Sequence, residues 1–492
     1  MSDLVLGVDV GTSSSKAVLA STDGDIVAVH VVEHDVSRPR PGWVEQDADA
    51  VWWGDVCALT RRVVADTDPG RIAAVCVSGI GPTVLPADEH GQPLRPAILY
   101  GVDIRAVGLA DELSAELGAE EILRRCGSTL SSQSAGPKVA WLRRHEPDVW
   151  ARTQYLFMAN SYVVHRLTGA YVLDHHSANQ CQPMYDRERG AWIPEWCERV
   201  APGLRLPELR WPADVAGHVT DEAARATGLR AGTAVAVGTI DAWAEAESVD
   251  VREPGDVMVM YGSTMFFIAV TAKPVSHPQL WGTVGQHPGL HTLAGGMASS
   301  GSITGWFRQL SGDRPYEELV AAAADVGAGA DGLLALPYFD GERTPFADPN
   351  ARGVIAGLSL RHGAGHVYRA LLEATAFGVR HNLEAFGEAG VDVGRIVAVG
   401  GGTKGDLWTQ IVSSATGVVQ EVPPVTVGAA YGDAKFAAVA IGAAGRDVKW
   451  NDGGHAVRPN PADAAVYDKR YPLYRSLYER TSDIQHALAA GG

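Results

Sequence analysis

The chain has 492 residues, of which 46% are hydrophobic and 20% charged, a composition typical of a globular protein with two or more domains. Its formal net charge of −17, from 41 basic and 58 acidic residues, argues against general nucleic-acid binding but leaves room for a local site that binds a small anion. The five cysteines form no C-x-x-C motif, which predicts a reduced, cytoplasmic protein. No apolar stretch approaches the roughly 18 residues that a membrane helix needs.

In the first half of the chain, a three-stranded meander is expected to lead into a helix and a buried strand. The strands are expected over residues 4–10, 15–20, 26–32 and 72–78, and the helix over about 47–66. A further apolar strand over 233–238 leads to Asp241, and Pro254-Gly255-Asp256 then breaks the chain. We place a domain boundary between about 244 and 256.

The second half repeats this order. A hairpin is expected over 257–270, helices over about 301–311 and 364–388, strands over 332–337 and 395–399, and a helical extension around 467–478. Because strands and helices alternate after an opening hairpin in both halves, the order predicts an α/β protein with helices packed on mixed sheets.

Two turns of similar design follow apolar strands about 250 residues apart. The first contains Gly11, Thr12 and Ser13, and the second contains Gly262, Ser263 and Thr264. Such turns present backbone N–H groups and hydroxyls to an anion, so two of them predict a polyphosphate held from both sides. The first turn is flanked by Asp9, which can hold a hydrated Mg²⁺ ion, and by Lys16, which can face phosphate charge. An ordinary hairpin is the alternative, but a carboxylate at the end of a buried strand is costly without a partner.

Two further strand ends carry candidate groups. The Gly-rich turn 400–404 lies between a strand and a helix, where a nucleotide can approach the backbone closely. Asp241 either acts as a general base on an attacking hydroxyl or caps the helix that follows, and local sequence leaves both open. Asp103 and Arg105 either bind substrate hydroxyls or form a surface ion pair. The sixteen histidines indicate no structural metal site.

Taken in order, these motifs resemble the FGGY carbohydrate kinases, which belong to the actin-like and hexokinase-like ATPases. The resemblance covers nearly the whole chain and includes Pro41–Asp47 with Trp52-Trp53, Lys138–Leu142, Pro337–Pro345 and residues 353–373. It implies two actin-like (ribonuclease H-like) domains with mixed sheets flanked by helices and a cleft between them. The domains implied are 1–246 on the sugar and phosphate side and 247–445 on the nucleotide side, followed by a helical extension over 446–492.

The resemblance also implies the site. It favours Asp241 as the catalytic base and Asp9 as the Mg²⁺ residue, acting through water. The residues expected to contact ATP are Gly11, Thr12, Ser13, Lys16, Gly262, Ser263, Thr264, Gly305, Gly401, Gly402, Thr403 and Lys404. The residues expected to contact substrate are Gly79, Ile80, Gly81, Thr83, Asp103, Arg105, Gln133 and Asp241.

The implied activity is transfer of the γ-phosphoryl group of ATP to a hydroxyl of a small sugar, with a ketopentose such as xylulose or ribulose as the leading substrate class. Departures from family patterns leave the sugar open. The turn Ser78–Thr83 lacks the Met-His pair of xylulokinases, and Gln133 replaces a tyrosine of glycerol kinases. Kinases of glycerol, erythritol or a deoxy-sugar, and a non-catalytic actin-like switch, are the alternatives. The expected partners are sugar and ATP, without nucleic acid or membrane, and a homodimer is left open.

Overall fold

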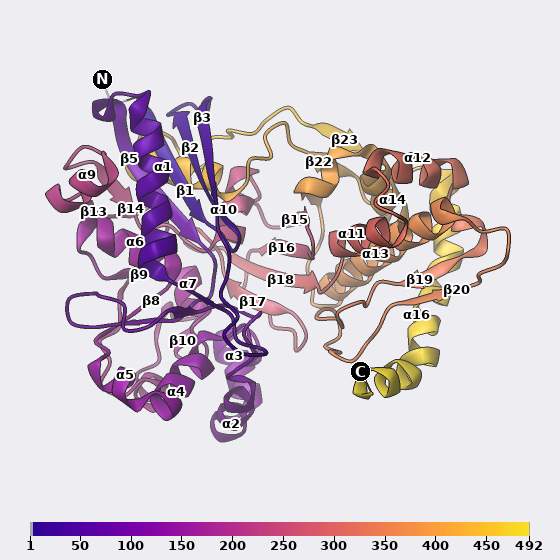
Figure 1. Ribbon diagram of the computed structural model, residues 1–492, viewed down its shortest axis with the longest axis horizontal. Helices are drawn as coiled ribbons and strands as arrows, with labels where there is room; N and C mark the ends of the chain where they lie inside the picture. The colour runs from indigo at the N-terminus through magenta and orange to yellow at the C-terminus, as the bar shows by residue number, and fades with distance from the viewer. Residues whose placement is uncertain (1–2, 492) are drawn as a thin grey trace.

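The computed structural model describes residues 3–491 and contains two sheets, one in each half of the chain (Figure 1). In the first sheet the strands lie in the order β13-β14-β5-β1-β2-β3, and in the second in the order β17-β18-β16-β15-β21-β22-β23. The first sheet contains β1 (Leu4–Val10), β2 (Ser14–Ser21), β3 (Ile26–Glu33), β5 (Ile72–Gly79), β13 (Val215–His218) and β14 (Ala234–Ala236). The second contains β15 (Asp256–Tyr261), β16 (Met265–Thr271), β17 (Trp281–Val284), β18 (His291–Met297), β21 (Arg395–Val399), β22 (Gln420–Val422) and β23 (His455–Val457).

Helices flank both sheets. Those of the first half are α1 (Gly54–Ala65), α2 (Val107–Leu117), α3 (Ala119–Cys126), α4 (Ala135–His145), α5 (Pro147–Arg152), α6 (Ala159–Thr168), α7 (His175–Asn179), α8 (Pro194–Val200), α9 (Asp221–Thr227) and α10 (Asp241–Ser248). Those of the second half are α11 (Gly301–Leu310), α12 (Tyr316–Val326), α13 (Ala364–Glu388), α14 (Asp406–Thr416), α15 (Ala429–Ala440) and α16 (Pro461–Ala490). Within residues 3–491, none of these helices combines the length and the apolar character needed to span a bilayer.

The two sheets share one plan. In each, an antiparallel hairpin (β1–β2 or β15–β16) is joined on its other side by a parallel strand (β5 or β21). Both sheets are therefore mixed, and the predicted α/β class with two sheet-containing halves is confirmed. The parallel pairing brings the carboxyl ends of β1 and β5 to one edge of the first sheet, which is where ligands bind in folds of this kind.

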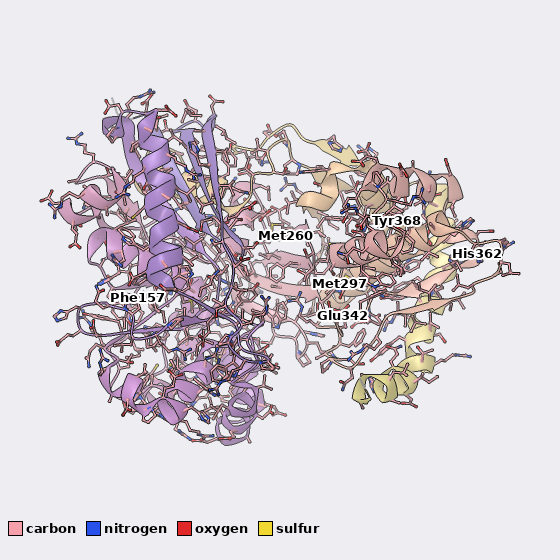
Figure 2. The ribbon with its side chains drawn as sticks, viewed as in Figure 1. Phe157, Met260, Met297, Glu342, His362 and Tyr368 are labelled. Carbon is pink, nitrogen blue, oxygen red and sulfur yellow. The ribbon has the colours of Figure 1, made fainter. Side chains whose placement is uncertain are left out.

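Each half has its own hydrophobic core. Phe157 belongs to the core of the first half, and Tyr368 belongs to that of the second. Figure 2 shows these two side chains far apart, with Met260 between them near the meeting of the halves. Burial of each such side chain stabilises the fold by roughly 1.5–3 kcal/mol, so each half holds together through its own packing.

Helix α15 joins the two halves, because it lies between β22 and β23 of the second sheet in the chain but packs on the first sheet. Its residues share a buried cluster with Val5 of β1 and Cys76 of β5. Two glycines permit the close approach: a Cβ on Gly7 would lie 1.9 Å from the carbonyl oxygen of Ala430, and one on Gly432 would lie 1.8 Å from that of Ala244 in α10. Helices α10 and α15 therefore form one buried contact between the halves, and a shared apolar cluster that includes Met258 of β15 forms another.

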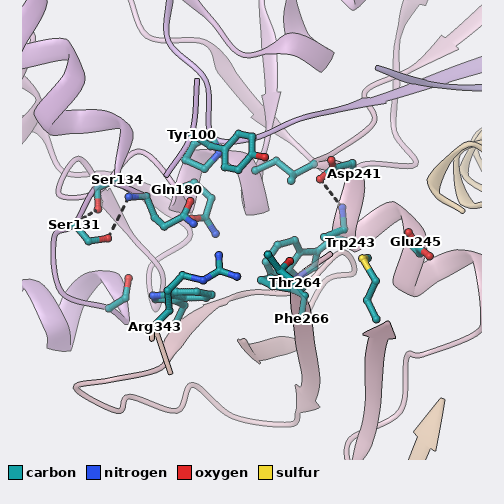
Figure 3. A pocket seen from close by; sticks show the side chains of 18 of the residues that line it. Tyr100, Ser131, Ser134, Gln180, Asp241, Trp243, Glu245, Thr264, Phe266 and Arg343 are labelled. Atoms are coloured by element: carbon teal, nitrogen blue, oxygen red, sulfur yellow. Dashed lines mark hydrogen bonds between the residues drawn. The ribbon is translucent and has the colours of Figure 1, made fainter. Parts of the chain in front are cut away.

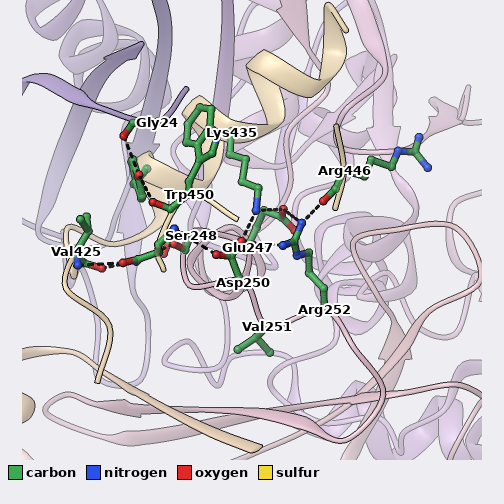
Figure 4. Close-up of polar contacts among 12 residues, drawn as sticks. Gly24, Glu247, Ser248, Asp250, Val251, Arg252, Val425, Lys435, Arg446 and Trp450 are labelled. Atoms are coloured by element: carbon green, nitrogen blue, oxygen red, sulfur yellow. Dashed lines mark hydrogen bonds and ion pairs between the residues drawn. The ribbon is translucent and has the colours of Figure 1, made fainter. Parts of the chain in front are cut away.

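A buried ionic cluster fixes this contact (Figure 4). The Nζ of Lys435 in α15 lies 3.1 Å from an Oε1 of Glu247 in α10 and also contacts Asp250. Arg252 pairs with Asp250 at 2.9 Å, and His287 pairs with Glu247 at 2.7 Å. Burial alone would raise the pKa of Glu247, but the surrounding positive charges outweigh it and lower that pKa to about 2. Glu247 is therefore ionised at neutral pH and ties the two helices together.

Candidate active site

A cavity of about 280 Å³ lies between the halves and is lined by both (Figure 3). The residues from the first half include Asp9, Gly81, Tyr100, Gln133, Gln180, Asp241 and Glu245. Those from the second half include Met260, Thr264, Phe266, Trp281 and Arg343. Amides, hydroxyls and aromatic rings on one wall and carboxylates on another suit a polar ligand next to a charged one.

Asp241 lies in this cavity as the first residue of α10, and Ile240 occupies the N-cap position. Its Oδ1 accepts a 2.7 Å hydrogen bond from the backbone N–H of Ala242. Burial raises the pKa of Asp241 well above its ordinary value, and the negative charge of Asp9 raises it further. A carboxyl group with a raised pKa is suited to accept a proton near neutral pH.

Two more carboxyl groups lie beside Asp241. Burial raises the pKa of Asp9 to about 6, although the charge of Lys16 opposes the shift, and the Ser78 hydroxyl lies 3.2 Å from Asp9. Burial and the charge of Asp9 raise the pKa of Glu245 to about 7. Lys16 is itself held by a 2.5 Å hydrogen bond to the carbonyl oxygen of Val427. Such a set of buried carboxyl groups would be stabilised in its ionised form by a bound cation.

The first phosphate-type turn is held from behind by the motif around residue 46. The backbone N–H of Gly11 donates to the carbonyl oxygen of Ser14 at 3.0 Å. The side-chain amide of Gln46 donates to the carbonyl oxygen of Thr12 at 2.9 Å, and Trp52 donates to Gln46 at 2.8 Å. The Thr12 hydroxyl lies 3.2 Å from that of Tyr100, which lines the cavity. The turn is thus rigid and adjoins the cavity.

The second turn has matching geometry. The N–H of Gly262 donates to the carbonyl oxygen of Thr264 at 3.1 Å, and Thr264 lines the cavity. The start of α11 docks on this turn, where the N–H of Gly301 donates to the carbonyl oxygen of Gly262 at 2.9 Å. The second turn therefore lines the cavity through Thr264, whereas Gly11, Thr12 and Ser13 are not among the lining residues and the first turn adjoins the cavity through Tyr100.

Comparison with known proteins identifies the architecture. Residues 4–246 match the N-terminal domain of the FGGY family of carbohydrate kinases, and residues 257–441 match its C-terminal domain. The chain belongs to the FGGY family of carbohydrate kinases. It is therefore a phosphotransferase of a family that uses ATP as the phosphate donor.

Several FGGY kinases resemble the chain over almost its full length. The crystal structure of xylulose kinase from Rhodospirillum rubrum is 33% identical, covers 98% of this chain and 100% of its own, and superposes with a TM-score of 0.90. Ribulokinase from Geobacillus thermodenitrificans is 29% identical over 96% of this chain and 94% of its own. Glycerol kinase from Nocardia farcinica is 30% identical over 89% of this chain and 90% of its own. The resemblance thus extends to relatives named for three different acceptors.

The residues expected to contact the sugar fall into two groups in this FGGY kinase. Gly81, Gln133 and Asp241 line the cavity. Gly79, Ile80, Thr83, Asp103 and Arg105 are not among the lining residues. Ile80 packs in the core of the first half, and the Thr83 hydroxyl accepts a hydrogen bond from the N–H of Ala159 at 3.1 Å.

Asp103 and Arg105 form a buried structural cluster instead of a surface pair. Their side chains are 0% exposed and are joined at 2.7 Å. The guanidinium lies 4.0 Å from the ring centre of Trp43 and 5.1 Å from that of Trp141, and Glu45 pairs with it at 2.8 Å. The pair therefore links α4 to the segment before α1.

The residues expected to contact the adenosine part of ATP lie in two places, after the end of β21 and within α11. Residues 401–404 form a short 3₁₀ turn there. A Cβ on Gly402 would lie 2.8–2.9 Å from Trp408 and Tyr261, so glycine is required for this packing. Gly305 lies within α11, where an added Cβ would make an ordinary 3.6 Å contact with Tyr316.

The groups that line the cavity but were not predicted from the sequence include Tyr100, Gln180, Glu245 and Arg343. Glu245 had a usable signal, because it lies four residues after Asp241 on the same helix face. Arg343 lay within a motif that was noted only as resembling the family. Tyr100 had no local signal that separates it from a core tyrosine.

Proposed function

We propose that the protein transfers the γ-phosphoryl group of ATP to a hydroxyl of a small sugar, a ketopentose such as xylulose or ribulose. The observation that carries this proposal is the location of Asp241 in a cavity that Asp9 and Thr264 also line. A base, a carboxylate suited to a hydrated cation and a phosphate-type turn thereby meet at one point. Asp241 begins α10 with its carboxyl group at the cavity, and its raised pKa suits it to accept the hydroxyl proton.

In the proposed reaction, the sugar hydroxyl oxygen attacks the γ-phosphorus and forms a new P–O bond. The bond between that phosphorus and the β,γ-bridging oxygen breaks, and its electron pair leaves with ADP. The hydroxyl proton passes to the carboxylate of Asp241. The turns Gly11–Ser13 and Gly262–Thr264 would grip the phosphates, and Lys16 would face their charge. Residues 401–404 and Gly305 would lie on the adenosine side.

Mg²⁺ is proposed as the cofactor, and the donor chemistry fits it. Asp9 and Glu245 are buried carboxyl groups with raised pKa values. A bound cation would lower these pKa values and so favour the ionised form of both groups. Among residues 3–491 there is no cluster of three or more side chains able to hold a metal by themselves. Mg²⁺ usually keeps several waters and binds substrate phosphates, so one carboxylate such as Asp9 suffices to position it. When bound, the ion would neutralise phosphate charge.

The two halves are proposed to act as domains over 1–246 and 247–445, with an extension over 446–492 in which α16 is helical and β23 joins the second sheet. The contact between α10 and α15 would serve as the pivot of closure, because α10 begins at Asp241 and buried ion pairs join it to α15. Closure would exclude water and limit wasteful hydrolysis of ATP. The five free, buried cysteines support a reducing compartment such as the cytoplasm.

The sugar class rests on the cavity wall formed by Gln133, Gln180 and their hydroxyl-bearing neighbours Ser131 and Ser134. Neutral donors and acceptors suit a polyhydroxylated substrate. A kinase of another polyol, such as glycerol, is the second candidate, since the glycerol kinase relative is as similar as the ribulokinase.

A coupled assay of ADP release over ketopentoses, aldoses and polyols tests the proposal. Sugar-dependent ADP release with a phosphorylated ketopentose as the product is expected. The highest kcat/KM for glycerol or erythritol would favour the second candidate. ATP binding without a phosphorylated product from any acceptor would contradict the proposed transfer.

A further inference from the structure

Arg343 presents an unpaired guanidinium group to the cavity (Figure 3). Its Nη2 donates to the carbonyl oxygen of Met297 at 2.8 Å. Its Nε is buried without a hydrogen-bond partner. Across residues 3–491, Arg343 has no carboxylate within 4.0 Å, and its Nη1 makes no hydrogen bond. The guanidinium thus keeps N–H groups, those of Nη1 among them, that no acceptor of the described residues satisfies.

The neighbouring carboxyl group of Glu342 attracts this cation but forms no ion pair with it within 4.0 Å. An Oε1 of Glu342 accepts hydrogen bonds from the backbone N–H groups of Ala298 and Arg343, each at 2.8 Å. Burial raises the pKa of Glu342 to about 8, so this carboxyl group is mostly protonated at neutral pH. An enclosed cation without a counter-ion costs free energy, which a bound anion would offset.

The segment that carries Arg343 is fixed on both sides. Glu342 is held as described, and Figure 2 shows it beside Met297. The Thr344 hydroxyl accepts from the N–H of Gly296 at 2.8 Å and donates to Asn382 at 2.6 Å. The guanidinium is therefore positioned before any ligand arrives, as electrostatic catalysis requires.

The guanidinium of Arg343 lies near the second phosphate-type turn, Gly262–Thr264. Met297, which accepts its hydrogen bond, pairs with Met265, and Met265 directly follows Thr264. On the facing wall, the phenol of Tyr100 is close enough to feel the charges of both Arg343 and Asp241 while it contacts Thr12. Arg343 thus shares one cavity with Thr264 of the second turn and with Asp241.

We propose that Arg343 binds the phosphoryl group while it passes from ATP to the acceptor hydroxyl. The inference rests on the proposed function and assigns this side chain a part in it. A planar guanidinium can donate two parallel hydrogen bonds to phosphoryl oxygens, whose charge must be stabilised in the transition state. The same oxyanion chemistry would also fit a carboxylate on the acceptor, and the test separates the two sources.

The test compares Arg343→Gln and Arg343→Lys with Arg361→Gln, a matched change at a guanidinium that is 66% exposed. Calorimetry measures binding of Mg·ADP alone and of Mg·ADP with aluminium fluoride and the best acceptor.

Arg343→Gln is expected to bind Mg·ADP within about twofold of the wild type but to lose about 100-fold or more in affinity with aluminium fluoride. Its kcat is expected to fall about 10²–10³-fold with little change in the acceptor KM. Millimolar guanidinium ion is expected to restore part of the kcat of Arg343→Ala.

Three results would overturn the assignment. One is an unchanged kcat and unchanged aluminium fluoride affinity in Arg343→Gln. Another is a kcat that is kept while KM rises only for acceptors with a carboxylate, which would assign Arg343 to the substrate. The third is an equal loss of ADP binding and of melting temperature in Arg343→Gln and Arg343→Lys without rescue by guanidinium, which would make the residue structural. If the wild-type protein formed no phosphorylated product, that result would contradict the proposed function, and the inference about Arg343 would fail with it.

Discussion

Asp9 and Asp241 come from different strand ends of the first half and face one cavity, where the charge of Asp9 raises the pKa of Asp241. Two carboxyl groups so placed oppose each other's ionisation unless a cation lies between or beside them. In the proposed reaction, a cation and phosphates bound beside the pair would therefore change the pKa of Asp241.

Activity should increase with pH through the raised pKa of Asp241, because a base works only when deprotonated. Glu245 adds negative charge that also raises this pKa. In Glu245→Gln that charge is lost, so the acid limb of the profile of kcat/KM against pH should move to lower pH. Glu388→Gln, at an exposed position of α13, serves as the control and should leave the limb in place. A limb that moves to higher pH in Glu245→Gln would contradict the electrostatic account.

Gly262→Val should weaken ATP binding by crowding the second turn. A Cβ at Gly262 would lie 3.2 Å from the carbonyl oxygen of Thr264, so the turn can accept a side chain only with a small shift. We expect the KM for ATP to increase about tenfold or more, or ~1.4 kcal/mol, with a small change in melting temperature. Gly363→Ala, where an added Cβ meets nothing within 4 Å, is the control. An unchanged KM for ATP would show that phosphates do not approach this turn.

Gly11→Val is a less direct test of phosphate binding by the first turn. A Cβ there would lie 2.6 Å from the carbonyl oxygen of Ser14, so the turn itself must change shape. We expect both a higher KM for ATP and a lower melting temperature. A melting temperature equal to that of the wild type would contradict the described packing of this turn.

Lys435→Met should destabilise the protein, because it leaves Glu247 and Asp250 buried without this cation. Removal of one partner of a buried pair typically costs about 3–5 kcal/mol in the free energy of unfolding. Urea denaturation measures the loss. The double variant Lys435→Met with Glu247→Gln should recover part of it. A loss no smaller in the double variant than in the single one would exclude the charge imbalance as the cause.

Discrimination between acceptors should be modest. The Gly81-Pro82 wall offers no charged or imidazole side chain, so a missing hydroxyl on the acceptor leaves few buried groups unpaired there. We expect measurable kcat/KM for at least two related ketoses or polyols. A preference for D-xylulose over every other pentulose and polyol by more than about a thousandfold, or ~4 kcal/mol, would refute this expectation.

Local patterns predicted most of the fold. The helix expected over 364–388 and the strand over 395–399 have those bounds, because amphipathic periodicity and glycine breaks are local signals. Docking of α15 on the first sheet could not be predicted in this way. It depends on Gly7 of β1 meeting Ala430 of α15, more than four hundred residues further along the chain, which no local signal encodes.

The site was predicted unevenly for a similar reason. Asp241 and Asp103 both follow strands, and only the tertiary packing decides which of them faces the cavity. Trp43 and Trp141 enclose Arg105, so its partner Asp103 is buried among them, while Asp241 remains at the cavity. Arg343 became visible as a candidate only when its unpaired guanidinium was located beside Thr264.

The rate of phosphoryl transfer by Asp241→Asn tests the central claim most directly. The substitution keeps the shape of the side chain and removes its ability to accept a proton. With the best acceptor at saturation, kcat should fall about 10²–10⁴-fold, while the calorimetric affinity for Mg·ATP stays near that of the wild type. A variant that keeps a near-normal kcat would contradict the assignment of Asp241 as the base.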